Sequence, residues 1–257
     1  MATSSKSSSS TGQGSHNTSI TDARRGNHNH SAAGTAIFIG LRPLSPIAQY
    51  QNLYRGWGPW LLSKIGASTI SPMLSTPGAS LSRHLLLAMS TGVTAKHIYW
   101  VLALNHEYFN PPIASLVGIG HLIFDTVASL LFLSPKTSAL LTGPYISIPG
   151  TGSALSVPIT LGTAMFTIGL LMETVAEAQR KQFKSNPENT GKIYTKGLWA
   201  LARHVNYGGY TLWSAGYMLA AGGWAAGLFV MALLTLDFYY RPIPGLDRYM
   251  TEKYGEQ

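Results

Sequence analysis

The sequence predicts an all-α protein, a polytopic integral membrane bundle of about five hydrophobic helices. Charged residues make up only 11% of the 257-residue chain and apolar residues 46%, whereas a soluble domain usually carries about 25% charge. Several apolar runs approach the roughly 20 residues that a helix needs to cross a bilayer. The sequence lacks the strand-like alternation of a membrane barrel, and only helices or closed barrels satisfy their backbone hydrogen bonds in lipid.

The first segment, residues 1–31, is rich in Ser, Asn, Gly and His and is predicted to be a disordered tail. Residues 32–152 are predicted to form the N-terminal membrane helices. Up to residue 68 the apolar runs are short, because prolines and basic residues interrupt them, so we expect short membrane-associated helices there. The interrupting residues are Arg42, Pro43, Pro46, Arg55, Pro59 and Lys64.

Two longer spans are predicted next, at residues 84–104 and 112–133. Both contain polar residues, which must face protein or water inside a membrane. We expect Asp125 to pair with Lys96 or with a histidine, and a proton relay through Asp125 is the alternative. The histidines of this region, His84, His97 and His121, are expected to be helix-packing or interfacial residues.

Residues 153–257 are predicted to form a separate C-terminal membrane domain. Residues 154–172 make a plausible span, after a Pro- and Gly-rich stretch that is expected to be a loop. A helix from about residue 198 to 220 and another at residues 224–240 are separated by "AAGGW", which is typical of a turn. We therefore expect a tight helical hairpin that dips into the membrane.

Basic residues are concentrated in one stretch of this domain. The formal net charge is +8, and six of the eighteen Lys and Arg residues lie in residues 180–203. This concentration beside uncharged runs is typical of a cytosolic loop in a membrane protein, so we expect that orientation and no nucleic-acid partner. The chain has no cysteine and its histidines form no zinc-type cluster, so no metal site is predicted.

Charged residues at the end of the 154–172 run share one helical face. Glu173, Glu177, Arg180 and Lys184 are spaced by three and four residues, which favours ion pairs along a solvated helix end. Glu173 fits that interpretation less well. It directly follows the uncharged run, where a carboxylate is costly unless it is paired.

The stretch "GLWALARHVNYGGY" repeats aromatic and polar residues at helical spacing. An interfacial aromatic belt with a snorkelling arginine is one explanation. The other is a polar wall for a polyanionic cofactor, because arginine offers a rigid fork for phosphate and asparagine offers both a donor and an acceptor. No G-x-G-x-x-G fingerprint follows a strand, so a nucleotide would be held without a Rossmann fold.

Two segments of the chain carry a family resemblance. "ETVAEAQRKQFKSNPENTGKIYTKGLWALARHVNYGGYTLW" and "PGLDRYMTEKYGEQ" resemble the C-terminal membrane domain of steroid 5α-reductases and sterol C14 reductases. The isoprenylcysteine carboxyl methyltransferases use the same catalytic fold. The resemblance covers about residues 160–257 and implies a C-terminal half that binds a cofactor.

The resemblance implies a cofactor site for NADPH. Arg180 and Lys184 would approach the phosphates, and Asp247 would be a cofactor-contacting acid. The residues that would line the nicotinamide and ribose are Trp199, Arg203, His204, Asn206 and Tyr207. The implied protein is an NADPH-dependent reductase of the endoplasmic reticulum that acts on a carbon–carbon double bond of a sterol-like lipid. Tyr207, Tyr210 and Glu173 are candidate proton donors.

Two alternatives to the reductase stay open, and departures from the family pattern support the second of them. Val205 replaces the usual proline, Tyr210 stands where steroid reductases often have glutamate, and Gly245 and Leu246 precede Asp247 where sterol C14 reductases have Arg-Asp. The first alternative is a methyltransferase that uses S-adenosylmethionine on a lipid or prenylated substrate. The second is a degenerate membrane protein without catalytic activity. Both enzyme hypotheses require a lipophilic small-molecule substrate and surrounding membrane lipids.

Overall fold

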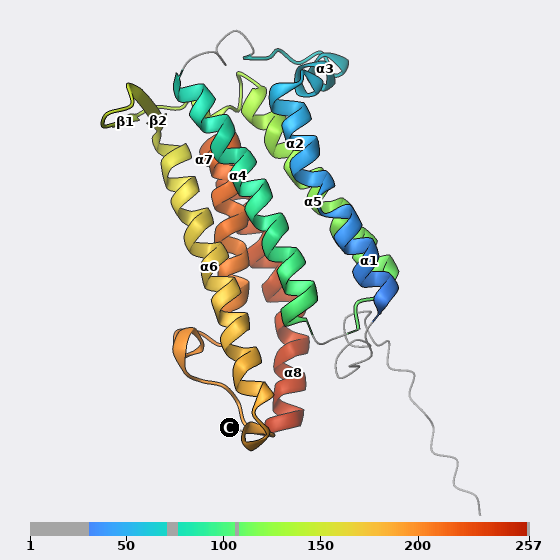
Figure 1. The fold of residues 1–257 in the computed structure, drawn as a ribbon. Helices are drawn as coiled ribbons and strands as arrows, with labels where there is room; N and C mark the ends of the chain where they lie inside the picture. The colour runs from blue at the N-terminus through green and yellow to red at the C-terminus, as the bar shows by residue number, and fades with distance from the viewer. Residues whose placement is uncertain (1–30, 71–76, 106–107, 256–257) are drawn as a thin grey trace, which may run out of the picture.

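The computed structural model describes residues 31–70, 77–105 and 108–255, and Figure 1 shows how they are arranged. Nearly all of the predicted tail lies outside this range. The α-helices are α1 (Ala32–Leu41), α2 (Leu44–Tyr54), α3 (Trp57–Lys64), α4 (Pro77–Tyr99), α5 (Pro111–Leu133), α6 (Val157–Ser185), α7 (Val205–Tyr240) and α8 (Pro242–Tyr254). Short helices are η3 (Trp100–Leu104), η4 (Ala139–Leu141), η5 (Pro187–Asn189) and η6 (Gly197–Ala200).

The prediction of an all-α membrane bundle is confirmed. Four described segments are long and apolar enough to cross a membrane. They are Gly78–Leu104, Pro111–Leu133, Val157–Ser185 and Val205–Tyr254. Helices α4, α6 and α7 run side by side, and α1 and α2 lie in line along α5 (Figure 1). Many large apolar side chains stay exposed on these helices, among them Leu116 and Phe229, as lipid-facing surfaces require.

The stretch before α6, which was expected to be a loop, contains a small hairpin. Strands β1 (Tyr145–Ile148) and β2 (Ser153–Ser156) pair antiparallel, with Tyr145 opposite Ser156. The side chain of Ser156 then caps α6, because its hydroxyl accepts from the backbone N–H of Ile159. The hairpin therefore fixes the point at which the third long segment begins.

The fold-back of the predicted helical hairpin is found, although its first helix begins at Val205 and not near residue 198. Helix α7 is interrupted at Gly223, whose φ of 71° and ψ of −166° are not helical, in the middle of "AAGGW". The chain folds back there, so Tyr207 near one end of α7 stacks on Phe238 near the other, with ring centroids 4.6 Å apart. Glycine is required at this position because a positive φ is strained for other residues.

Close glycine contacts join α6 to α7, the most extensively packed pair of helices. A Cβ atom on Gly169 would lie 2.4 Å from the backbone nitrogen of Trp213, and one on Gly209 would lie 2.7 Å from the backbone nitrogen of Glu173. Small residues allow such an approach between membrane helices. This contact holds Trp213 beside Glu173, a pairing that matters for the site.

The expected partner of Asp125 is wrong. Lys96 pairs with Glu173 instead, and Asp125 accepts a hydrogen bond from the hydroxyl of Ser90 at 2.7 Å. Ser90 and Lys96 are both on α4 but six residues apart, which places them roughly 120° apart around the helix axis. The side of α4 that carries Ser90 meets α5, and the side that carries Lys96 meets α6.

Candidate functional site

A cavity of about 300 Å³ lies among α1, α4, η3, α5, α6 and α7, at the lower end of the volume range of ligand pockets. Its aromatic lining comprises Phe38, Trp100, Tyr108, Phe109 and Tyr210. Its charged or imidazole lining comprises Lys96, His97, His121, Glu173 and Glu177.

Trp100 is the first residue of η3, a five-residue π-helix that directly follows α4. Such irregular helical turns often occur at functional sites. The Lys181 ammonium donates to the carbonyl of Ala103 and so fastens η3 to α6.

A buried ion pair closes one side of the cavity. The Lys96 ammonium contacts Oε1 of Glu173, with side chains only 5% and 8% exposed. The other carboxylate oxygen, Oε2, accepts a hydrogen bond from the indole N–H of Trp213 at 2.7 Å. Both oxygens of Glu173 are thus satisfied, which confirms that this carboxylate is paired inside the apolar segment.

Glu177 lies one helical turn further along α6 and also lines the cavity. Its Oε2 is buried without a hydrogen-bond partner in the described part of the chain. Among the described lining residues there are two carboxylates, Glu173 and Glu177, and one ammonium, Lys96. If both carboxylates are counted as ionised and both histidines as neutral, the formal charge of the lining is −1, a balance that suits a cationic ligand.

The sequence-predicted cofactor residues gather beyond Glu177, at the ends of α6 and α7 and on α8. The guanidinium of Arg180 lies over the Trp199 ring, 5.5 Å from its centroid, and the Trp199 indole N–H donates to the carbonyl of Ala176 at 2.7 Å. The Lys184 ammonium donates to the hydroxyl of Tyr254 at 2.9 Å. These contacts hold the end of α6 against the loop before α7 and against α8.

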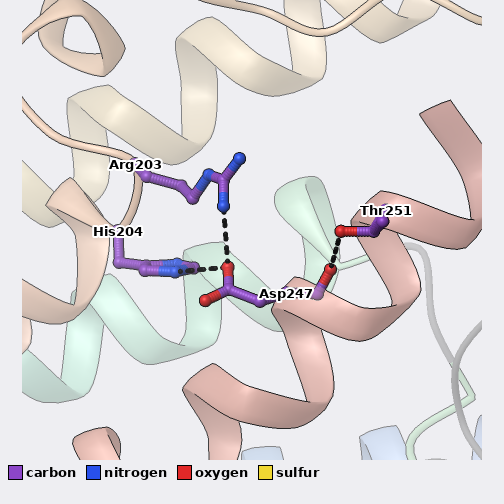
Figure 2. Close-up of polar contacts among 4 residues, drawn as sticks. All are labelled: Arg203, His204, Asp247 and Thr251. Carbon is purple, nitrogen blue, oxygen red and sulfur yellow. Dashed lines mark hydrogen bonds and ion pairs between the residues drawn. The ribbon is translucent and has the colours of Figure 1, made fainter. Parts of the chain in front are cut away.

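Asp247 joins the remaining predicted residues, as Figure 2 shows. Its Oδ1 lies 3.3 Å from Nη1 of Arg203 and 3.2 Å from Nε2 of His204, and its backbone carbonyl accepts from the Thr251 hydroxyl. The His204 ring stacks on Tyr207 at 5.6 Å. The structure thus joins Arg203, His204, Tyr207 and Asp247 in one cluster, although the Arg203 side chain is 61% exposed. Arg180 and Trp199 form a separate contact.

The cavity also contains residues that the sequence did not mark as functional. Lys96, His97 and His121 lie on α4 and α5, far in sequence from the C-terminal motifs. Their only signal was a polar residue inside an apolar span. Such a residue must find a partner, but the sequence does not say which one.

The C-terminal half matches the family model described as "Protein of unknown function (DUF1295)", over residues 123–257. The chain belongs to the DUF1295 family. In addition, this DUF1295 chain is 37% identical over 239 residues to a protein of Ustilaginoidea virens named "Probable O-methyltransferase ustE". That alignment covers 89% of the chain and 82% of the relative. No solved structure matches the chain.

The family match covers only part of the site. The matched region of the DUF1295 chain begins within α5 and contains Glu173, Glu177 and the eight predicted cofactor residues. Lys96, His97 and His121 precede it. The cavity is therefore built jointly by the matched region and by the helices in front of it.

Proposed function

We propose that the protein is a membrane-embedded O-methyltransferase, which transfers a methyl group from S-adenosylmethionine to an oxygen atom of a lipophilic small molecule. The observation that carries this proposal is the formally negative, aromatic-lined cavity, with one unpartnered carboxylate oxygen on Glu177. The name of the relative, which is similar over most of the chain, supports the same class of enzyme. Enzyme classes that bind anionic cofactors fit this cavity less well.

The residues of the cavity fit the charge of this cofactor. S-Adenosylmethionine supplies an electrophilic methyl group on a positively charged sulfur. A cation is attracted to aromatic faces, and Tyr210 and Trp100 both line the cavity. Glu177 would hold the positive end by charge. A pyrophosphate would instead be repelled by the same carboxylate.

The apolar walls would bind the second substrate. Phe38, Phe109 and Trp100 meet edge to face, with centroids 5.2 Å and 5.8 Å apart for the two pairs that include Phe109. Such a wall excludes water and accepts a lipophilic molecule from the surrounding bilayer. The proposal includes a location in the endoplasmic reticulum, which the family resemblance implies. It places residues 180–203 in the cytosol, because their basic residues follow the positive-inside rule.

The NADPH-dependent reductase remains a second candidate because of two cations. Arg180 and Lys184 form no ion pair within the described residues and lie at the same end of α6. Phosphate groups require such cations. Arg203 is less suited to this role because Asp247 already neutralises it.

Binding isotherms on the detergent-purified full chain separate the two candidates. We expect wild type to bind S-adenosylmethionine and Glu177→Gln to bind it about 10-fold to 100-fold more weakly. This range follows from roughly 1.5–3 kcal/mol for a hydrogen bond to a charged group and about 1.4 kcal/mol per decade. Glu188→Gln is the matched control, because Glu188 is exposed on η5, and it should not change the affinity.

The double substitution Arg180→Ala with Lys184→Ala supplies the opposite test. It should leave the binding of S-adenosylmethionine unchanged, whereas it would weaken the binding of NADPH by about 100-fold or more if the phosphates lay there. The methyltransferase proposal fails if wild type binds NADPH but not S-adenosylmethionine and the double variant loses that binding.

A further inference from the structure

His121 has a fixed orientation and one unused nitrogen. Its Nδ1 lies 2.8 Å from the carbonyl oxygen of Val117. A carbonyl only accepts hydrogen bonds, so Nδ1 carries the proton and the neutral ring has a free lone pair on Nε2. That nitrogen is buried and has no hydrogen-bond partner among the described residues. The side chain nevertheless lines the cavity.

Neighbouring rings hold the imidazole from two sides. His97 meets it edge to face with centroids 4.5 Å apart, and Trp213 is stacked on it at 6.4 Å with an interplanar angle of 21°. Trp213 is itself fixed by its hydrogen bond to Glu173. The ring is thus pre-oriented by packing and by one hydrogen bond, as a functional group in a rigid site should be.

The free nitrogen requires an explanation. More than nine-tenths of buried polar groups in proteins are hydrogen-bonded, and burying one without a partner costs free energy. A histidine that served only for helix packing would gain by forming a second hydrogen bond. A ligand in the cavity that carries a hydrogen-bond donor would satisfy Nε2 and remove this cost.

We propose that Nε2 of His121 accepts the proton of a substrate hydroxyl group, so that the acceptor is a lipophilic alcohol or phenol and not a carboxylic acid. This inference rests on the proposed methyltransferase function. In the reaction the hydroxyl oxygen forms a bond to the methyl carbon while the carbon–sulfur bond breaks. The electron pair of that bond stays on sulfur, which becomes a neutral thioether, and the hydroxyl proton moves to Nε2.

The charges of the cavity support a neutral acceptor. A carboxylate needs no base for methylation, but once the positive charge of S-adenosylmethionine balances the formal charge of −1 of the lining, a carboxylate would add a negative charge that no further cation of the described lining balances. The ammonium of Lys96, the only cation among the described lining residues, is already paired with Glu173. A hydroxyl compound avoids this unbalanced charge. It does require a proton acceptor. Among the described lining residues, Nδ1 of His97 and Oε2 of Glu177 are also unpartnered. Glu177 is assigned to the cofactor, whereas the hydrogen bond to Val117 fixes Nε2 of His121 as an acceptor.

The experiment compares three probes that share one lipophilic body: para-hexylphenol, para-hexylanisole and para-hexylbenzoic acid. Their binding to the detergent-purified full chain is measured by calorimetry in wild type, His121→Asn and His121→Gln. The asparagine amide reproduces the Nδ1 side of the ring but not Nε2, whereas the glutamine carbonyl reaches the place of Nε2 and accepts a hydrogen bond without being a base. His84→Asn is the matched control, because His84 donates from Nδ1 to the Ser80 carbonyl in the same way but is exposed.

Wild type is expected to bind the phenol about tenfold more tightly than the anisole, as one hydrogen bond of about 1.4 kcal/mol gives. This preference should persist in His84→Asn and His121→Gln and disappear in His121→Asn. With S-adenosylmethionine present, both His121 variants should transfer methyl groups to the phenol at least about 100-fold more slowly than wild type, since general base catalysis contributes that much or more.

The results separate this inference from the proposed function. If wild type binds phenol and anisole equally, or if His121→Asn keeps the preference, the assignment of His121 is overturned. Formation of a base-labile methyl ester from the benzoic acid, with no ether from the phenol, would overturn the hydroxyl class while the methyltransferase function stands. If S-adenosylmethionine does not bind wild type at all, the proposed function itself fails, whatever the phenol preference shows.

Discussion

Breaking the buried ion pair between Lys96 and Glu173 should destabilise the bundle strongly, and removing both charges should restore much of the loss. Lys96→Met leaves a carboxylate that is 8% exposed with only the Trp213 N–H as its partner. Glu173→Gln keeps an acceptor for Trp213 but leaves a buried ammonium unpaired. Each single substitution is expected to lower the free energy of unfolding by about 3–5 kcal/mol.

The double variant contains neither charge. Its remaining loss is a hydrogen bond between side chains, which contributes about 1 kcal/mol net. The double variant should therefore be more stable than either single variant by roughly 2 kcal/mol or more. Unfolding of the detergent-purified chain by dodecyl sulfate, followed by circular dichroism, measures all four proteins. Lys136→Met serves as a control because Lys136 is exposed.

Additivity would refute this reasoning. If the double variant loses as much stability as the two single variants combined, the groups act independently, and the short contact between them does not contribute to the fold. A loss of the same size in Lys136→Met would show instead that any removal of a lysine destabilises the chain in this assay.

Two further predictions use the same unfolding assay. Gly169→Ala should lower the free energy of unfolding by about 1–3 kcal/mol, because overpacking forces α6 away from α7. Gly120→Ala is the control and should lower it little, since no atom lies within 4 Å of the Cβ position there. Equal effects of the two substitutions would contradict the close contact between the helices. Asp247→Asn should change the free energy of unfolding by less than about 1 kcal/mol, because the ion pair of Asp247 with Arg203 is largely exposed to solvent. A loss of several kcal/mol would show that the attachment of α8 depends on this ion pair.

Part of the site followed from sequence patterns within one region of the chain. The resemblance selected residues such as Arg203, His204 and Asp247, and the structure places these three in contact. Polar residues inside the apolar spans also signalled a buried site, since they require partners in lipid. Expecting His121 to be only a packing residue, however, left its unpartnered nitrogen unnoticed, because the sequence contains no record of which polar atoms lack a partner.

The sequence by itself determined the long apolar helices, the fold-back at Gly223 and the need for a partner of Glu173, because run length, turn residues and the cost of a charge in lipid are local properties. Only the tertiary structure decided that the partner is Lys96, 77 positions away, and that Asp125 is bound to Ser90 instead. Helical periodicity shows which residues share a face, but not which neighbouring helix that face meets. Here α4 packs against α6 and is joined to α5 through the hydrogen bond of Ser90, and these contacts decide the neighbours. The ion pair, the imidazoles and Glu177 thereby line one cavity.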